Sequence, residues 1–142
     1  PDLISSIASR FGSQCVVVAI DTNLDHGSWM VYLDGGRTPA GLKTSEWAKR
    51  AESLGAGEIL LTSMKNDGTK DGFSIDLTDM ISRSVNIPVI ASGGAGRKEH
   101  FRDVFKKTGC SAALAASVFH FGEIDIMELK KYLKEENINV RL

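Results

Sequence analysis

The sequence predicts an α/β fold of four parallel strand–helix units, which is half of a (β/α)₈ barrel. Three observations support this fold class: four short apolar runs, helical periodicity between them, and a length of 142 residues. Strands that alternate with helices imply right-handed crossovers and a parallel sheet. A complete barrel of this kind needs roughly 200–250 residues, so four units amount to half of one. We therefore expect residues 1–142 to form a single half-barrel, whose edge strands and apolar inner face need a partner.

The four predicted strands are runs rich in β-branched and other apolar residues. They cover residues 15–20, 58–61, 88–91 and 112–115. None of them alternates polar and apolar residues cleanly, and continuous apolar runs are typical of strands buried on both faces of a parallel sheet. Residues 55–63 also resemble residues 109–117 at a constant offset, which indicates that the second and fourth units are copies.

Helical segments precede, separate and follow these strands. A helix over residues 3–11 precedes the first strand and stops at Gly12. The last helix is expected to start at Asp125, because Glu128 three residues later completes a pattern like a capping box. Apolar stripes at helical spacing fill the three intervals between strands. Their residues are Trp47, Ala48, Ala51 and Leu54, then Leu77, Met80 and Ile81, and finally Phe101, Val104 and Phe105.

One connection, residues 22–42, is far longer than the others. Residues 29–33 followed by Asp34, Gly35 and Gly36 are typical of a β-strand and a glycine turn. We therefore expect a small hairpin in the loop after the first strand.

Composition excludes several classes of protein. The 17 Lys and Arg residues nearly balance the 18 Asp and Glu residues, which argues against a strongly basic nucleic-acid footprint. No apolar run approaches the roughly 20 residues of a membrane helix, and the start does not resemble a secretory leader. The first residue, Pro1, suggests a fragment or a processed or engineered product. We expect a cytoplasmic protein that binds neither nucleic acid nor membrane, with Cys15 and Cys110 as two buried thiols rather than a disulfide or metal site.

Polar or glycine-rich residues follow each predicted strand. In (β/α) barrels the active site lies at the carboxyl ends of the strands, so these positions are the candidate site. In chain order they are Asp21, then Thr62, Ser63, Asn66, Asp67, Gly68 and Thr69, then the Ser-Gly-Gly-Ala-Gly loop at 92–96, and then Ala116 and Ser117.

The glycine loop at 92–96 is a candidate anion site. It leads into a helix, so its N–H groups can approach an anion without a Cβ in the way, and the helix dipole assists. As a pattern it fits a plain structural turn equally well. The small residues Ala116 and Ser117 after the next strand favour phosphate binding, because the loops after the seventh and eighth strands often hold phosphate in these barrels. Asp67-Gly68-Thr69 is a turn signal whose position brings the Gly68 N–H to the same pocket.

Asp21 is the candidate acid–base residue. A carboxylate at the end of a buried strand loses hydration, which is costly unless the group has a partner or a function that requires it there. Two interpretations remain open: proton transfer at the barrel mouth, or capping of the following loop. The histidines His26, His100 and His120 match no zinc spacing and are interpreted as surface or supporting residues, so no metal and no cofactor is expected.

Six segments together form a specific combination: residues 11–14, 16–21, 55–63, 67–72, 90–96 and 113–120. Through them the whole chain resembles the C-terminal half of the cyclase subunit of imidazole glycerol phosphate synthase, from histidine biosynthesis. The isomerase of the same pathway shares the Asp-Gly-Thr and Ser-Gly-Gly motifs, but not the Ala-Ala-Ser-Val-Phe-His sequence at 115–120.

The resemblance implies a phosphate-binding TIM barrel and a lyase reaction. Ammonia from a glutaminase partner is added to phosphoribulosyl-formimino-aminoimidazole-carboxamide ribonucleotide, giving imidazole glycerol phosphate and an aminoimidazole carboxamide ribotide. It implies two catalytic aspartates, of which one matches Asp21 and the other belongs to the N-terminal half. Thr62 and Ser92 match active-site neighbours, and Glu58 matches one member of a charged gate on the ammonia path. The matching phosphate-binding positions are Asp67, Gly68, Gly93, Gly94, Ala116 and Ser117.

The missing half limits what this chain is expected to do. One residue cannot protonate and deprotonate at once, so we expect phosphate binding without appreciable turnover. The N-terminal half, or a second copy of this half, would cover the apolar inner face. A non-enzymatic alternative is an excised or designed half-barrel that self-associates, and a weaker enzymatic alternative is another ribulose-phosphate barrel, such as the isomerase.

Overall fold

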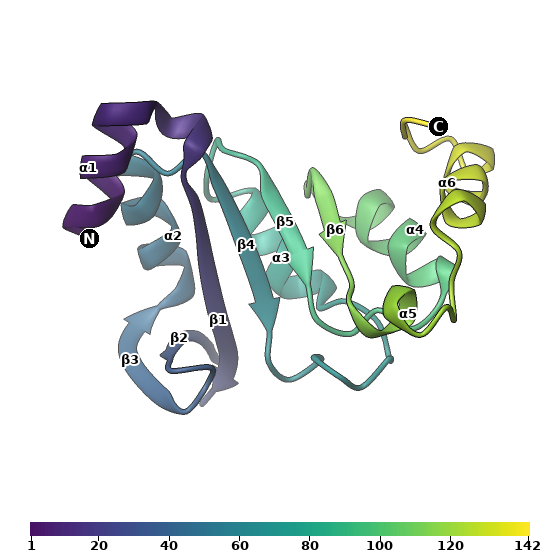
Figure 1. The fold of residues 1–142 in the computed structure, drawn as a ribbon. Helices are drawn as coiled ribbons and strands as arrows, with labels where there is room; N and C mark the ends of the chain where they lie inside the picture. The colour runs from purple at the N-terminus through teal and green to yellow at the C-terminus, as the bar shows by residue number, and fades with distance from the viewer.

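The computed structural model describes all 142 residues. They form one six-stranded sheet with helices packed along it (Figure 1). The strand order is β3-β2-β1-β4-β5-β6, so the sheet is open, with β3 and β6 at its edges. The neighbours β1, β4, β5 and β6 are parallel, and the hairpin strands β2 and β3 join antiparallel beside β1. The strands are β1 (Val17–Asp25), β2 (Ser28–Leu33), β3 (Thr38–Lys43), β4 (Glu58–Ser63), β5 (Val89–Ser92) and β6 (Ala112–Leu114).

The helices confirm the predicted alternation of strands and helices. They are α1 (Asp2–Phe11), α2 (Thr44–Ser53), α3 (Ile75–Ser82), α4 (Lys98–Lys107), α5 (Ser117–His120) and α6 (Ile126–Glu135), with a 3₁₀ turn η1 (Ser13–Cys15). The sequence did not predict α5, because a single turn of four residues carries no periodic pattern. None of these helices has both the length and the apolar character needed to cross a membrane.

The first strand is longer than the sequence predicted. β1 continues to Asp25, so the expectation that Asp21 follows the end of its strand is wrong. The reason is the hairpin: β2 pairs antiparallel with residues 21–25 and supplies the ladder partners that β4 no longer offers. The hairpin itself, predicted within residues 22–42, is confirmed.

A buried pair of hydroxyls fixes this hairpin to the rest of the domain. The Thr22 hydroxyl donates to the Met30 carbonyl at 2.9 Å and accepts from the Thr44 hydroxyl at 2.6 Å. Both threonines are fully buried, and Thr44 begins α2. Because each buried hydroxyl has a partner, the two groups avoid the cost of burying an unpaired polar atom.

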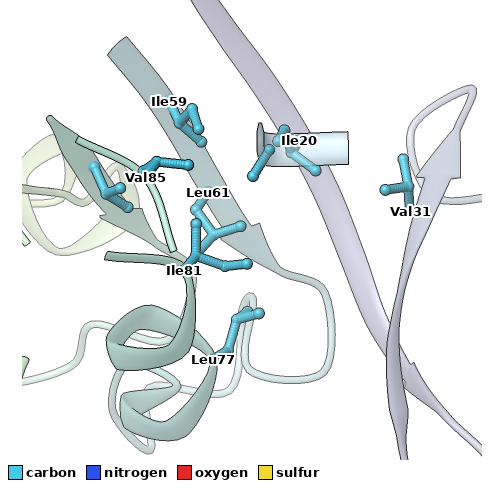
Figure 2. Close-up of a cluster of buried hydrophobic side chains, with 9 residues drawn as sticks. Ile20, Val31, Ile59, Leu61, Leu77, Ile81 and Val85 are labelled. Atoms are coloured by element: carbon cyan, nitrogen blue, oxygen red, sulfur yellow. The ribbon is translucent and has the colours of Figure 1, made fainter. Parts of the chain in front are cut away.

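The main core lies between the sheet and helices α2 and α3. Ile20, Ile59, Leu61, Leu77 and Ile81 are almost completely buried there, and Figure 2 shows Leu61 of β4 close to Ile81 of α3. Fully burying one such side chain contributes about 1.5–3 kcal/mol.

The opposite face of the sheet is open, as expected for a half-barrel whose apolar inner face needs a partner; burial of the strands on both faces would require that partner. Burial alternates along β4 and β5, because only alternate side chains reach the helices. On the open face Val17 is 51% exposed and Leu114 is 43% exposed. An apolar surface of this kind is typical of a face that another part of a barrel covers.

A second core joins the last two units. Phe101 and Val104 of α4 pack with Leu129 and Leu133 of α6. The predicted start of α6 is confirmed, since the Asp125 carboxylate accepts from the Glu128 N–H at 2.9 Å. The reciprocal half of a capping box is absent, because the Glu128 carboxylate pairs with Lys98 Nζ at 3.0 Å.

The two cysteines are free, and the prediction that both are buried is wrong for one of them. Cys15 is exposed, because it lies in η1 before β1 begins rather than in the strand. Cys110 is half-buried, and this burial raises the pKa of its thiol.

Candidate functional site

The open face of the sheet carries a row of polar side chains near the carboxyl ends of the parallel strands. Asp21 of β1 is in register with Thr62 of β4, and Thr62 is in register with Ser92 of β5. Residues in register point to the same face of a sheet. With strands about 4.8 Å apart, the backbone of Asp21 lies about 10 Å from that of Ser92.

The surroundings of Asp21 bear on its two interpretations. Its side chain is half-buried, and its carboxylate forms no hydrogen bond or ion pair with the following loop or with any other group of the chain. Loop capping therefore has no contact to support it. Proton transfer by Asp21 stays a prediction.

Glu58 lies on the same face at the other end of β4. It is in register with Val17, four residues before Thr62, and it is half-buried. Its carboxylate forms no hydrogen bond or ion pair in the chain. The position at the amino end of the strand agrees with the predicted gate position, and the gate function itself stays a prediction.

A pocket of about 290 Å³ lies where β5 and β6 end. It brings together all six residues that the sequence assigned to phosphate binding, together with Ser92, whereas Asp21, Thr62 and Glu58 lie outside its lining. The lining residues are Asp67, Gly68, Lys70, Ser92, Gly93, Gly94, Ala95, Leu114, Ala115, Ala116 and Ser117.

The pocket offers a set of backbone donors without partners in the chain. Gly93, Gly94 and Ala95 are all buried, and none of their N–H groups donates a hydrogen bond within the protein. Gly68 and Ala116, on the neighbouring loops, also have N–H groups without a partner. Buried N–H groups in proteins nearly always pair with a protein group or an ordered water, so consecutive ones without a protein partner in a pocket are free to bind an anion, a carbonyl group or water.

Only glycine fits the two central positions of this loop. Gly93 has φ 90° and Gly94 has φ 102°, a region that other residues rarely adopt. A Cβ on Gly93 would lie 2.7 Å from the Ser63 carbonyl oxygen, and one on Gly94 would collide with the Gly72 carbonyl oxygen. The glycine loop is therefore more than a turn signal, because its backbone is packed against the loop after β4.

Hydrogen bonds join these two loops. Ser63 Oγ donates to Asn66 Oδ1 at 2.8 Å, and Asn66 Nδ2 donates to the Gly72 carbonyl at 2.9 Å. The Gly72 N–H in turn donates to the Gly94 carbonyl at 2.7 Å. This chain of contacts runs from the end of β4 to the middle of the glycine loop and fixes the geometry of the unpaired donors.

Charged side chains contribute less to the pocket than its backbone does. Lys70 is the only cation in the lining, and its Nζ already pairs with Glu123 at 2.6 Å. Asp67 is exposed, and its N–H donates to the Ser63 carbonyl at 2.9 Å. Asp67 thus offers a phosphate no free backbone donor, so its predicted part in binding would have to come from its carboxylate, which suits a hydroxyl.

Comparison with known proteins shows the family to which the chain belongs. The family model described as "Histidine biosynthesis protein" matches residues 1–125. The chain belongs to the histidine biosynthesis protein family.

Curated relatives are similar to the chain over its whole length. Imidazole glycerol phosphate synthase subunit HisF of Hydrogenobaculum sp. (strain Y04AAS1) is 62% identical, and that of Parabacteroides distasonis is 58% identical. The subunit of the same name from Clostridium botulinum (strain Okra / Type B1) is 57% identical. Each alignment covers 100% of this chain and 57% of the relative, so the chain spans little more than half the length of the proteins it matches.

Family membership confirms the resemblance and the fold class that the sequence predicted. The parallel strand–helix units and the open sheet are what half of a barrel from this family requires. Ala95 lies in the candidate loop at 92–96, but the sequence did not place three other lining residues of the pocket in the site: Lys70, Leu114 and Ala115. Lys70 and Ala115 could have been found, because they directly adjoin the predicted strand-end motifs at 67–69 and 116–117. Leu114 carries no such signal, because it lies inside the predicted strand 112–115 and only the fold shows that it borders the pocket.

Proposed function

We propose that this chain is the C-terminal half of a cyclase subunit of imidazole glycerol phosphate synthase. In this reaction, ammonia supplied by a glutaminase converts phosphoribulosyl-formimino-aminoimidazole-carboxamide ribonucleotide into imidazole glycerol phosphate and an aminoimidazole carboxamide ribotide. The half described by the structure holds one phosphate group of the substrate and supplies Asp21 as one of two acid–base residues.

The observation that carries the proposal is the row of unpaired N–H groups at Gly93, Gly94 and Ala95 inside the pocket. Oriented backbone donors at a glycine loop suit the oxygens of a phosphate monoester, and they supply binding without a cationic side chain. The relatives named as this synthase subunit support the choice of substrate.

Asp21 stands at a suitable distance from this phosphate site. The register places it about 10 Å from Ser92 along the row, which is about the span of a phosphorylated ribose or ribulose chain. Thr62 lies between the two positions on the same face and would contact the middle of such a substrate. The second aspartate would come from the other half of the barrel, facing Asp21 across the mouth.

The test is ammonia-dependent turnover by the intact protein that contains this chain. Asp21→Asn is expected to lower kcat by about 10²–10⁴-fold, the usual contribution of one acid–base group, while phosphate affinity is kept. Asp79→Asn is the matched control, because Asp79 lies on α3 in an exposed ion pair with Arg83 and should leave kcat unchanged. Full activity of Asp21→Asn would overturn the proposed role.

The 142-residue chain by itself provides a second test. We expect it to bind phosphate but to give no appreciable turnover, because it carries one of the two required aspartates. Turnover close to that of the intact protein would contradict the proposal that each half supplies one of the two catalytic aspartates.

Glu58 is proposed as part of the entry path for ammonia from a glutaminase partner. It lies at the amino end of β4, opposite the pocket, on the face that would line the barrel interior. Glu58→Gln should impair glutamine-dependent turnover more than turnover with added ammonium. Equal losses with both nitrogen sources would count against a gate.

A second candidate function is self-association of the half-barrel without catalysis. The exposed apolar side chains on the open face, Val17 and Leu114 among them, favour it. Sedimentation of the purified 142-residue chain decides the matter: a monomer at micromolar concentration would exclude it.

A further inference from the structure

His100 is a buried histidine that the proposed chemistry does not use. It lies on α4, directly after the glycine loop, and is only 8% exposed. Of the three histidines it is the buried one, whereas His26 and His120 are exposed. Sequence reasoning treated all three as surface or supporting residues. The structure places the ring of this one against Gly96 and Gly72, next to residues that line the pocket.

The ring of His100 contacts both loops that form the phosphate pocket. Its Nδ1 accepts from the Gly96 N–H at 3.1 Å, at the end of the glycine loop. Its Cδ2 edge packs beside Gly72, where an added Cβ would lie only 3.5 Å away. Gly72 in turn donates to the Gly94 carbonyl. The unpaired N–H groups of residues 93–95 therefore lie next to two backbone groups that are held by hydrogen bonds. These are the Gly94 carbonyl, bonded to the Gly72 N–H, and the Gly96 N–H, bonded to the His100 ring.

The protonation state of the ring decides whether this contact exists. Arg97 Nε also approaches the ring, at 2.9 Å from Nε2, so both ring nitrogens face donors. A neutral imidazole has one lone pair to offer and one N–H. The Gly96 N–H is held by the backbone, whereas the Arg97 side chain can rotate away, so the lone pair belongs on Nδ1. An imidazolium would direct a ring N–H at the Gly96 N–H and break the contact.

We propose that neutral His100 is a positioning residue that holds the glycine loop in its anion-binding form, and that protonation of this ring releases the loop. The inference rests on the phosphate-binding role proposed above. It assigns to His100 a contact with the loop and none with the substrate.

Some of the groups around the His100 ring lower its pKa and others raise it. Burial, followed by the Arg97 guanidinium, lowers the pKa of His100 below its ordinary value, while Glu99, Asp103 and Asp71 act to raise it. The net lowering keeps the ring neutral at pH 7. Anion binding at the loop is therefore complete above the ordinary His pKa of about 6.5 and declines as the pH falls through the lowered pKa.

Sulfate is a suitable probe, because its charge stays constant over the pH range that titrates histidine. The experiment records amide and imidazole resonances of the intact, isotope-labelled protein during sulfate titrations between about pH 7.5 and about pH 5, a range that spans the ordinary His pKa. We expect sulfate to shift the Gly93 and Gly94 amides, and the Gly96 amide to titrate together with the His100 ring. Sulfate affinity should fall by about tenfold or more, the equivalent of one lost hydrogen bond.

Two variants distinguish positioning from simple core packing. Asn places an oxygen acceptor near the position of Nδ1 but does not titrate, so His100→Asn should keep sulfate affinity and lose its pH dependence. His100→Ala should weaken sulfate binding at every pH. The matched control is His26→Asn, in the exposed hairpin turn at φ 46°, a backbone conformation that Asn tolerates. This control should retain the wild-type pH profile.

The outcomes separate this inference from the proposed function. If sulfate does not shift the Gly93 and Gly94 amides at any pH, the phosphate role is overturned and this inference with it. If sulfate binds but its affinity is independent of pH, or if His100→Asn keeps the wild-type pH profile, only the role of His100 is overturned.

Discussion

Gly94 shows how much of the site depends on single backbone conformations. It has φ 102° in a loop that lines the pocket with three N–H groups without a partner, and its carbonyl accepts from Gly72. Gly72 itself has φ 114° and packs against His100. These positions need glycine for two reasons at once, a positive φ and a close approach of the two loops.

Gly94→Ala tests this requirement. The variant should lose about 1–3 kcal/mol of unfolding free energy from backbone strain alone, with a further loss because the new Cβ meets the Gly72 carbonyl oxygen. Gly122→Ala is the matched control: its φ of 67° is also positive, but nothing lies within 4 Å of the added Cβ. The control should lose only about 1–2 kcal/mol. Chemical denaturation measures both, and equal losses would show that the close approach is unimportant.

At the scale of elements, α4 and α6 show how a helix stays in place at the edge of an open sheet. Leu129 and Leu133 bury one face of α6 against α4. Around this contact, Arg102 donates to the Tyr132 hydroxyl at 3.1 Å, and Lys106 pairs with Glu136. Exposed ion pairs each contribute only about 0–1 kcal/mol, so the apolar contact and the helix cap fix the position of α6.

The cap of α6 is open to a direct test. Asp125→Ala removes the side-chain acceptor of the Glu128 N–H and should destabilise the protein by about 0.5–2 kcal/mol. Ser74→Ala is the matched control, because Ser74 precedes α3 without forming a side-chain cap. Its loss should be close to zero. The stabilities of the two variants are compared by thermal unfolding under the same conditions. A larger loss of stability for Ser74→Ala than for Asp125→Ala would contradict the assignment of the cap.

At the scale of the whole molecule, the sheet has one face covered by helices and one face open. Figure 1 shows the helices of the middle units along one side of β4 and β5, and the hairpin beside β1 at one edge. The open face carries both the polar row near the carboxyl ends and exposed apolar side chains such as Val17. A covering partner would therefore complete the core and enclose the row of polar side chains together.

Val17→Lys tests whether this face is covered in an assembly. In the isolated chain Val17 is exposed, so the substitution should change stability by less than about 0.5 kcal/mol. It should prevent association with the N-terminal half or a second copy, because it would bury an unpaired charge. Met80→Lys, on the outer surface of α3, is the control and should leave association unchanged. Sedimentation of each variant alone and mixed with the N-terminal half gives the result, and unimpaired association of Val17→Lys would contradict it.

The sequence by itself determined the strand–helix alternation, the family, and the gathering of the candidate site motifs at the carboxyl ends of the strands. These features follow from local periodicity and from the rule that parallel strands end at one edge. Tertiary structure alone decided the rest: the extension of β1 to Asp25, the exposure of Cys15, the ion pair between Lys70 and Glu123, and the burial of His100, which contacts the end of the glycine loop. Each of these depends on which distant segment supplies a partner or covers a side chain. Spacing along one segment of the chain does not encode that information.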